Sequence, residues 1–369
     1  MMARTPVIGV LGAGSWGTAL AMVLSRNGAR VKLWSHLPAQ VKQLRQDGEN
    51  REFLPGISFP DRLEVTDDLG SAVQYSDEVL VVVPSHAFRQ VLESAAPLCN
   101  ADSSVSWATK GLEPLTGKLL HQVAEECLGP RPFAVISGPS FAGEVARGLP
   151  TAITVASASR RHAQRVAGYL QCDCFRPYTS EDVIGLEVGG ATKNVMAIAA
   201  GIADGLGFGA NTRAALITRG LAEIMRLGLA LGGRQETFMG LGGLGDLVLT
   251  CTDDQSRNRR MGLALARGLA HDPDLLLADE PTANLDYIQA EQVIRLLREL
   301  RSKGRIIIVS THDDRLLPVA DRIVDMAPDR RPDARAKPRA NPLLANGLAR
   351  PPAGGPPVVI RPGQGYAGT

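Results

Sequence analysis

The sequence predicts an α/β protein with an additional helical part, and three observations support this prediction. Short apolar segments alternate with helical segments from residue 7 to about residue 155, which is typical of a parallel sheet covered by helices. A glycine-rich turn directly follows the first apolar segment. From about Val183 the pattern changes to long stretches rich in Ala, Leu and Gly, which favour helices. We therefore expect an α/β domain at residues 1–182 and a helical domain at residues 183–262.

The strands of the α/β domain are predicted from short apolar segments bounded by turn residues or helical stretches. The segment at residues 79–83 ends at Pro84, which cannot donate a ladder hydrogen bond. In the helical domain, the glycines at 205–209 and 240–245 are expected to break the helices. The expected strands are residues 7–11, 31–34, 79–83, 104–107, 133–136 and 152–155.

Two further segments are expected after residue 262. A strand at Leu275–Ala278, a charged helix at Ile288–Leu300 and a strand at Arg305–Val309 predict a small α/β unit over residues 263–327. These strands are expected to lack sheet partners of their own. Residues 328–369 contain nine prolines and an excess of basic residues without periodic apolar positions, which predicts a disordered basic tail.

The composition excludes several classes of protein. Hydrophobic residues make up 44% and charged residues 21% of the 369 residues, and the formal net charge is +2, so neither disorder of the whole chain nor nucleic-acid binding is expected. The five cysteines form no CxxC pair and no signal-peptide pattern opens the chain, which favours a reduced, cytoplasmic location. No apolar run approaches the roughly 18 residues of a membrane span, and the composition predicts no metal site.

The glycine-rich turn is the first chemical signal. Gly12, Gly14 and Gly17 form a GxGxxG pattern between a predicted strand and a predicted helix. In a Rossmann-like domain these glycines allow the tight turn, the approach of a pyrophosphate and close packing of helix on strand. Ser15 and Trp16 lie at the start of the helix, whose free N–H groups favour phosphate. The competing interpretation is a glycine turn without a ligand.

The end of the second strand bears on the choice of dinucleotide. A ribose-binding carboxylate is usual about 20 residues after the glycine turn, but residues 32–36 read Lys-Leu-Trp-Ser-His and contain no Asp or Glu. The 2′-phosphate of NADP would therefore meet no carboxylate here, which favours NADP over NAD without excluding NAD. Lys32 and His36 are either contacts to the adenosine end of the cofactor or solvated surface groups.

Several further blocks carry a resemblance to a family. The first 260 residues resemble the bacterial NAD(P)-dependent glycerol-3-phosphate dehydrogenases, and six blocks occur in the family's order. This resemblance implies hydride transfer between NAD(P)H and dihydroxyacetone phosphate, giving sn-glycerol 3-phosphate for phospholipid synthesis. It implies small-molecule partners and leaves a homodimer open. The blocks are Val81-Val82-Val83-Pro84-Ser85-His86, Trp107-Ala108-Thr109-Lys110-Gly111-Leu112, Ile136-Ser137-Gly138-Pro139-Ser140-Phe141-Ala142, Gly189-Gly190-Ala191-Thr192-Lys193-Asn194-Val195, Gly243-Leu244-Gly245-Asp246-Leu247 and Asp253-Asp254-Gln255-Ser256-Arg257-Asn258-Arg259.

The resemblance also assigns roles to individual residues. Lys193 matches the general acid/base, which requires a depressed lysine pKa, although an isolated lysine on a helix is usually solvated. Asp246 either binds a substrate hydroxyl or orients a lysine, and its alternative role is a helix N-cap. His86 is interpreted as a structural histidine. The substrate-binding set implied is Lys110, Gly138, Ser140, Lys193, Asp246, Ser256, Arg257 and Asn258, and the cofactor-binding set is Gly12, Gly14, Ser15, Trp16, Gly17, His36, Lys110, Ala142 and Arg257.

The polar cluster at residues 256–258 is expected to bind phosphate. Its three side chains offer a hydroxyl, a guanidinium and an amide within three residues, and arginine can grip a phosphate with two parallel hydrogen bonds. The competing interpretation is a solvated basic segment, which Arg259 and Arg260 extend.

The sequence departs from this family after residue 260. Residues 263–327 resemble the C-terminal portion of an ABC-transporter ATPase. They contain a Walker B-like segment at residues 275–282, which includes Asp279 and Glu280, a D-loop-like Asn284-Leu285-Asp286 and a switch-like His312. The resemblance implies Mg²⁺ binding by Asp279, polarisation of water by Glu280 and γ-phosphate sensing by His312. Because the chain has neither a GxxxxGK[ST] loop nor an LSGGQ-like signature, hydrolysis by this chain alone is not expected. The alternatives are thus a dehydrogenase, an ATPase-derived nucleotide-binding module, or an inactive fusion that binds cofactor without turnover.

Overall fold

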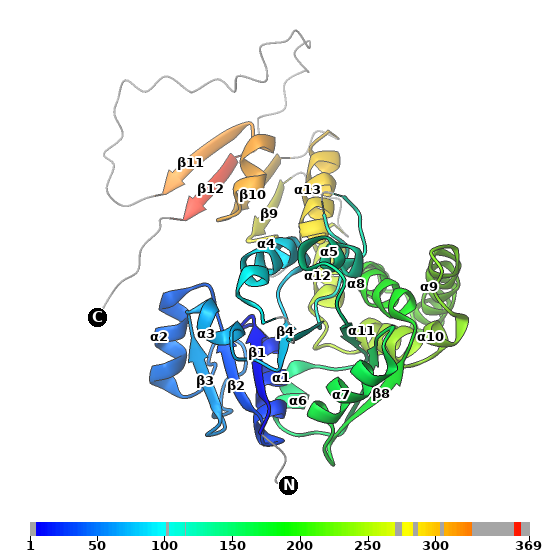
Figure 1. Ribbon diagram of the computed structural model, residues 1–369. Coiled ribbons are helices and arrows are strands. Elements are labelled where there is room, and N and C mark those ends of the chain that lie inside the picture. Colours follow the sequence, from blue (N-terminus) through cyan, green and yellow to red (C-terminus); the bar gives the residue numbers. More distant parts are fainter. Residues whose placement is uncertain are drawn as a thin grey trace. The chain divides into compact units, whose positions relative to one another are not determined.

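The protein consists of two compact units, residues 1–266 (unit 1) and residues 267–369 (unit 2). The computed structural model describes residues 5–100, 103–114, 116–269, 275–282, 287–302, 306–326 and 358–362. Unit 1 contains a large sheet and a group of helices, and unit 2 contains a small sheet (Figure 1).

The large sheet of unit 1 has eight strands in the order β3-β2-β1-β4-β5-β6-β7-β8. Strand order reverses beside β1, so that β2 and β4 flank it, as in dinucleotide-binding sheets. All six expected strands overlap observed ones to within two residues at either end, and the strands at residues 7–11 and 104–107 coincide with their predictions. The strands are β1 (Val7–Leu11), β2 (Arg30–Trp34), β3 (Leu63–Thr66), β4 (Glu78–Val81), β5 (Ser104–Trp107), β6 (Phe133–Ser137), β7 (Thr151–Ala156) and β8 (Phe175–Ser180).

The expectation of a purely parallel sheet is wrong at one position, because β6 and β7 pair antiparallel. A parallel connection needs a crossover of a dozen or more residues, usually through a helix that spans the sheet. Only the five-residue helix α6 (Ala142–Ala146) lies between these two strands. The strands β3 and β8 were not expected. The first has only four residues, and the second contains a proline, Pro177.

Helices cover both faces of this sheet because successive side chains of its strands point to opposite faces. Ile8 and Val10 belong to one buried cluster, with α1, α6 and α7, whereas Leu11 and Val81 belong to the other, with α4 and α5. The helices are α1 (Ser15–Arg26), α2 (Pro38–Asp47), α3 (Leu69–Val73), α4 (Ser85–Ala95), α5 (Leu120–Leu128), α6 (Ala142–Ala146) and α7 (Arg160–Leu170).

The helical part of unit 1 begins with the long helix α8 (Val183–Gly205). Among the described helices, α8 is long and apolar enough to cross a membrane, but 56% of that apolar window is buried within the protein, as in a core helix. The breaks expected at residues 205–209 and 240–245 are confirmed by the ends of the helices. The remaining helices are α9 (Ala210–Ala230), α10 (Gln235–Met239), α11 (Asp246–Thr252), which follows a π-turn at Leu241–Gly245, and α12 (Arg257–Leu269).

Glycines allow α8 and α12 to pack backbone to backbone. A Cβ atom at Gly201 would lie 2.0 Å from the carbonyl oxygen of Arg259, and one at Gly262 would lie 2.1 Å from that of Ile198. Both distances are too short for any side chain. The two helices therefore cross in direct contact, as the small residues of this region predict.

Unit 2 contains a parallel sheet in the order β11-β12-β10-β9. The expectation that its strands lack partners is therefore wrong. One of them, β12, lies within the segment predicted to be a disordered tail, where the sequence Val-Val-Ile favours a strand. The rest of that tail lies outside the described residues. The elements are β9 (Leu275–Asp279), α13 (Tyr287–Ser302), β10 (Ile306–Ser310), a 3-10 helix (Asp314–Val319), β11 (Arg322–Met326) and β12 (Val358–Pro362).

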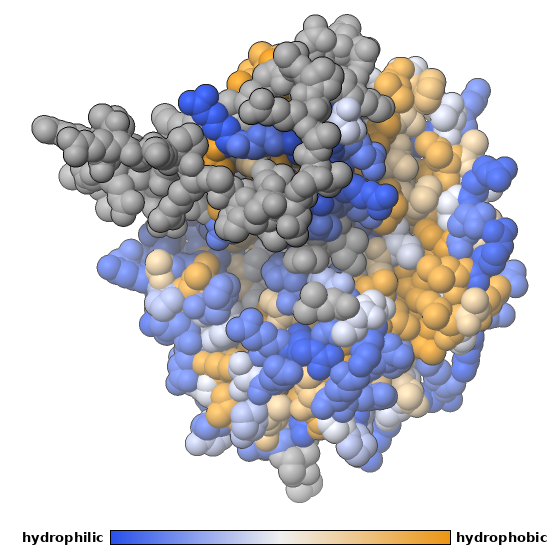
Figure 2. Space-filling view, turned by 90° about the horizontal axis from the view of Figure 1, so that it is seen from above, coloured by the Kyte–Doolittle hydropathy of each residue, from blue (hydrophilic) through white to orange (hydrophobic). Residues whose placement is uncertain are grey.

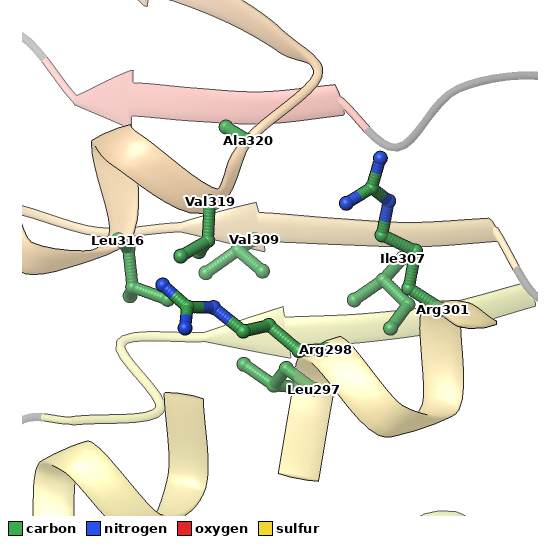
Figure 3. Close-up of a pocket in the computed structure, with 8 residues that line it drawn as sticks. All are labelled: Leu297, Arg298, Arg301, Ile307, Val309, Leu316, Val319 and Ala320. Carbon is green, nitrogen blue, oxygen red and sulfur yellow. The ribbon is translucent and has the colours of Figure 1, made fainter. Parts of the chain in front are cut away.

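A small apolar pocket lies in unit 2 between α13, β10 and the 3-10 helix, as Figure 3 shows. Its apolar walls belong to the buried cluster of this unit. The lining residues are Leu297, Arg298, Arg301, Ile307, Val309, Leu316, Val319 and Ala320.

Candidate functional site

The glycine-rich turn has the geometry that a bound pyrophosphate requires. Gly12 has φ +120°, and a Cβ atom there would lie 2.2 Å from the carbonyl oxygen of Val82, so only glycine fits. A Cβ atom at Gly17 would lie 1.9 Å from the carbonyl oxygen of Gly12. Gly14, the N-cap of α1, has open space where its Cβ would be. Gly12 and Gly17 thus close the turn, while Gly14 leaves room for a ligand at the helix N-terminus.

A buried asparagine that the sequence analysis did not single out supports this turn. Asn50 is 1% exposed, and its amide donates to the carbonyl oxygen of Ala13 at 3.1 Å and to the hydroxyl of Thr18 at 2.9 Å. It lies 37 residues beyond Ala13, in no motif, so nothing in the sequence could have identified it. Ser15 and Trp16 form the first turn of α1, and Trp16 packs against the adjoining apolar cluster.

The end of β2 carries the residues considered for the adenosine end of a cofactor. Lys32 is half-buried within the strand and His36 is exposed just beyond it. Ser35 is buried, and its hydroxyl is hydrogen-bonded to the amide oxygen of Gln40 at 2.5 Å. No carboxylate side chain lies among residues 30–37, and cationic side chains are present instead.

A buried aspartate joins two lysines that are far apart in the sequence. Asp246, the first residue of α11, is 1% exposed. One carboxylate oxygen forms an ion pair with Lys110 Nζ at 2.5 Å, and the other pairs with Lys193 Nζ. Lys193 also donates to the hydroxyl of Thr250 at 3.0 Å. Asp246 makes no side-chain cap at α11, so the structure favours the lysine-orienting role over the N-cap role.

The electrostatics of this cluster favour proton transfer near neutral pH. Burial lowers the pKa of the Lys193 ammonium to about 8, and Lys110 lowers it further while Asp246 opposes the change. Burial also acts to raise the pKa of Asp246, but the two ammonium groups outweigh it and hold that pKa below its ordinary value. The carboxylate therefore stays ionised, and two ammonium groups beside one carboxylate leave an excess positive charge for an anionic substrate.

The lysine cluster lies at the same sheet edge as the glycine turn. Gly12 approaches Val82 after β4, and the hydroxyl of Thr109, just before Lys110, donates to the carbonyl oxygen of Val83 at 2.8 Å. Lys110 in turn donates to the carbonyl oxygen of Gly138 after β6, at 3.3 Å. The carboxyl ends of β1, β4, β5 and β6 thus converge, which is where parallel sheets bind ligands.

The loop after β6 brings further expected residues to this edge. Gly138 has φ +147°, and a Cβ atom there would lie 2.9 Å from the Cα of Ile153. The hydroxyl of Ser140 donates to the carbonyl oxygen of Gly138 at 3.4 Å. Ala142 begins α6. Behind the loop, a Cβ atom at Gly190 on α8 would lie 3.2 Å from the Ser137 hydroxyl oxygen, so small residues let helix and sheet edge meet.

The expected phosphate cluster at residues 256–258 lies at the start of α12. The buried hydroxyl of Ser256 accepts the N–H of Arg259 at 3.2 Å, and so acts as a helix cap. Arg257 is exposed and forms no ion pair with a described residue. Partial desolvation of its guanidinium lowers the pKa of Arg257, and the nearby positive charge of Arg260 lowers that pKa further. Arg259 is buried and pairs with Asp204 at 2.6 Å, so it is not a solvated extension of a basic segment. Arg257 thus presents a guanidinium that is available to an anion.

A second buried ion pair connects the two parts of unit 1. Glu187 on α8 accepts the N–H of the Trp107 ring at 3.2 Å and the backbone N–H of His121 at 3.0 Å, and its carboxylate lies 2.6 Å from His121 Nδ1. Glu187 lines a small cavity with Lys110, Ser137 and Gly190. Sequence reasoning missed this group, and also Thr250, which the spacing of four residues from Asp246 could have indicated.

In unit 2, two of the three ATPase-like residues meet. Glu280 follows β9 with φ +43°, and its carboxylate accepts the backbone N–H of His312 at 3.1 Å. The His312 ring lies 3.7 Å from the same oxygen. Asp279 ends β9 and is exposed. The D-loop-like residues 284–286 lie outside the described residues.

Unit 1 therefore has the architecture of a two-domain dehydrogenase that binds a nicotinamide dinucleotide. Its Rossmann sheet holds the glycine turn, and its helical part contributes a lysine of lowered pKa at the carboxyl edge of that sheet. Comparisons with known proteins agree. The family model described as the NAD-dependent glycerol-3-phosphate dehydrogenase N-terminus matches residues 7–163, and the family model described as the C-terminus matches residues 182–308. The second match extends past residue 260, so the expected departure from the family at that residue is not confirmed.

Curated relatives and solved structures point the same way. The chain is 60% identical over 271 residues to a glycerol-3-phosphate dehydrogenase [NAD(P)+] of Thioalkalivibrio sulfidiphilus, covering 73% of this chain and 81% of the relative. The corresponding enzyme of Tolumonas auensis is 58% identical over 71% of this chain and 79% of its own length. The crystal structure of glycerol-3-phosphate dehydrogenase from Coxiella burnetii aligns with a TM-score of 0.70 at 44% identity, covering 81% of this chain and 89% of that one. The chain belongs to the NAD-dependent glycerol-3-phosphate dehydrogenase family.

Proposed function

We propose that the protein is an NAD(P)-dependent sn-glycerol-3-phosphate dehydrogenase that reduces dihydroxyacetone phosphate to sn-glycerol 3-phosphate for phospholipid synthesis. The observation that carries this proposal is the pair of lysines on the buried carboxylate of Asp246, at the edge where the glycine turn lies. The reaction consumes one hydride and one proton. NAD(P)H supplies the hydride when bound at the glycine turn, where the open space at Gly14 fits a pyrophosphate.

Side chains of the protein supply the proton and the positive charges that bind the substrate. Lys193, with a pKa of about 8, donates a proton to the ketone oxygen as the oxygen gains charge, and takes it back in the reverse reaction. Asp246 fixes its position, and Thr250 fixes its orientation. Lys110 adds a second positive charge near the ketone oxygen of the substrate. The guanidinium of Arg257 binds the substrate phosphate. Gly138 and Ser140 form the loop that closes against substrate, and Asn258 adds an amide donor beside Arg257.

The cofactor we propose is NADP in preference to NAD, and the cell compartment is the cytoplasm. The residues Lys32 and His36 at the end of β2 support the choice of NADP, because a 2′-phosphate meets no carboxylate there. Ala142, at the start of α6, lies in the loop that would face the cofactor. Comparing the initial rates with NADPH and NADH at equal concentration tests this preference.

The assay for the main proposal is the loss of NADPH absorbance in the presence of dihydroxyacetone phosphate. The purified full chain should turn over, and Lys193→Ala should lose about 10²–10⁴-fold in kcat. Lys42→Ala, on the exposed side of α2, is the matched control and should keep the wild-type rate. Folded wild-type protein that binds NADPH without turnover would establish the inactive-fusion alternative and refute the proposal.

The exposed apolar residues of the helical part bear on that alternative and on assembly. Figure 2 shows apolar residues gathered on the side of the molecule that carries α9 and α10. Such a patch fits a second copy of the chain. We propose a homodimer, and the sedimentation coefficient of the full chain tests it. The exposed residues include Leu206, Phe208, Leu227, Leu229, Leu231 and Met239.

A second candidate function, nucleotide binding by unit 2, is supported by the contact of Glu280 with His312 at the ends of adjacent parallel strands. We propose that the ATPase-like segment binds Mg-ATP without hydrolysing it, with Asp279 as the metal ligand. Mg-ATP should raise the unfolding temperature of wild type and leave Asp279→Ala unchanged. Wild-type protein whose unfolding temperature does not respond to Mg-ATP would refute this second proposal and leave the first intact.

A further inference from the structure

Two cysteines outside the dehydrogenase site lie side by side in a tight turn between α7 and β8. The sulfur atoms of Cys172 and Cys174 are 3.5 Å apart. Both residues are free thiols and half-buried. The other three cysteines, Cys99, Cys127 and Cys251, are also free, and none has a sulfur neighbour among the described residues.

The backbone holds this turn in one shape. Cys172 donates its N–H to the carbonyl oxygen of Phe175 at 3.0 Å, and Phe175 donates back to Cys172 at 3.2 Å. The carbonyl oxygen of Cys174 accepts the N–H of Thr151 at 2.8 Å, at the start of β7. Phe175 is 1% exposed and anchors the turn in the core. The two thiols are therefore kept close by the fold and not by chance side-chain motion.

A contact from α1 fixes the chain before the turn. The amide of Asn27 donates to the carbonyl oxygens of Tyr169 at 3.0 Å and Gln171 at 3.3 Å. The turn is thus tied to neighbouring elements on both sides. A disulfide needs a sulfur separation of about 2.05 Å, so the sulfurs would close by about 1.5 Å, which side-chain rotation can supply.

We propose that Cys172 and Cys174 form a reversible dithiol–disulfide modification site that reacts with low-molecular-weight disulfides. One thiolate attacks a sulfur of the small disulfide, forming a mixed disulfide and releasing one small thiol. The second thiolate attacks the protein sulfur of the mixed disulfide and releases the other small thiol. The protein loses two electrons and two protons, and the small disulfide gains both.

The other cysteines provide internal references for this chemistry. Cys99 and Cys127 are half-buried, as the pair is, but each lacks a second sulfur to complete the exchange. They can accept an adduct from the small disulfide but cannot release it. A closed disulfide at one site and adducts at the others are therefore distinguishable in one sample.

The experiment treats the reduced full chain with increasing oxidised glutathione, blocks remaining thiols with N-ethylmaleimide, and analyses tryptic peptides by mass spectrometry. The peptide with Cys172 and Cys174 contains no other cysteine. This peptide should become lighter by two hydrogen atoms and carry neither a glutathione adduct nor maleimide. The change should occur at a concentration of oxidised glutathione about tenfold lower than the concentration at which Cys99 or Cys127 reacts, because the second thiol is already in place. Dithiothreitol should restore both thiols.

Cys172→Ser and Cys174→Ser are the matched variants. Each should convert the closed disulfide into a glutathione adduct on the remaining cysteine, while the circular dichroism spectrum stays that of wild type. The proposal is overturned if the wild-type peptide carries two separate adducts, if it links two chains, or if it stays fully maleimide-modified when Cys99 and Cys127 have reacted.

Discussion

Replacing Lys193, the proposed proton donor, should stabilise the protein while it abolishes activity. Lys193 is buried, and its pKa falls from 10.5 to about 8 in the folded state. A lysine with a folded pKa below its unfolded value binds its proton less tightly when folded, so its charge costs stability below about pH 8. That cost disappears as the pH rises through the unfolded pKa near 10.5. Lys193→Met keeps the aliphatic stem and removes the charge.

The size of the effect follows from the shift. At 1.36 kcal/mol per pKa unit, the shift of Lys193 corresponds to about 3 kcal/mol at pH 7, and to less than about 1 kcal/mol at pH 10. For a unit of this size, a gain of about 3 kcal/mol raises the unfolding temperature by roughly 5–10 °C. Asp246 keeps Lys110 as an ion-pair partner in the variant, so the substitution leaves no unpaired buried carboxylate.

Thermal unfolding followed by tryptophan fluorescence reports on the right part of the chain, because Trp16, Trp34 and Trp107 all lie in unit 1. Lys193→Met should unfold at a higher temperature than wild type at pH 7 and at nearly the same temperature at pH 10, with activity lost at both. The control Lys42→Met should match wild type throughout. A variant that is less stable than wild type at pH 7, or whose advantage persists at pH 10, would refute the assignment of a charge-strained lysine.

Four further outcomes are expected. Lys193 is proposed to donate a proton in ketone reduction and to accept it in alcohol oxidation. The rate of ketone reduction should therefore fall, and the rate of alcohol oxidation should rise, as the pH passes about 8. Two rates that change in the same direction with pH would contradict this role. Gly12→Ala places a Cβ atom 2.2 Å from a carbonyl oxygen and should lower both the unfolding temperature and NADPH affinity. Gly14→Ala meets no protein atom within 4 Å, so in fluorescence titrations it should weaken NADPH binding without lowering the unfolding temperature. Arg257→Gln should raise the KM for dihydroxyacetone phosphate about 10–100-fold, because a charged hydrogen bond to the phosphate is lost. The neighbouring control Arg260→Gln should change this KM by less than about threefold, because it removes only an exposed charge.

The sequence predicted the features that depend on short-range patterns. The first strand coincides with its expected bounds, and the helix break between Gly205 and Gly209 lies where glycines interrupt the pattern. The glycine turn was predicted with its chemistry because the three glycines, the preceding strand and the following helix are adjacent in the chain. Local sequence carries this information directly, since side-chain periodicity and backbone freedom act within a few residues.

The contacts between distant residues could not be predicted in the same way. Lys110 and Asp246 are separated by 136 residues, and only the fold brings them together with Lys193. Family resemblance suggested that Asp246 orients a lysine, but not that one carboxylate serves two lysines. The antiparallel pairing of β6 with β7 was missed because an apolar strand has the same pattern in either direction. The Glu187–His121 pair was missed because each residue alone resembles an ordinary helix residue.

The direct crossing of α8 and α12 has a consequence for the history of the chain. Gly201 and Gly262 bring the two backbones together, and the crossing continues to Gly205 and Ala266, where unit 1 ends. The contacts that hold the lysine-bearing helix against α12 are therefore all encoded within unit 1. A different carboxyl-terminal sequence could be joined at this point without altering the chain that positions the reactive amine.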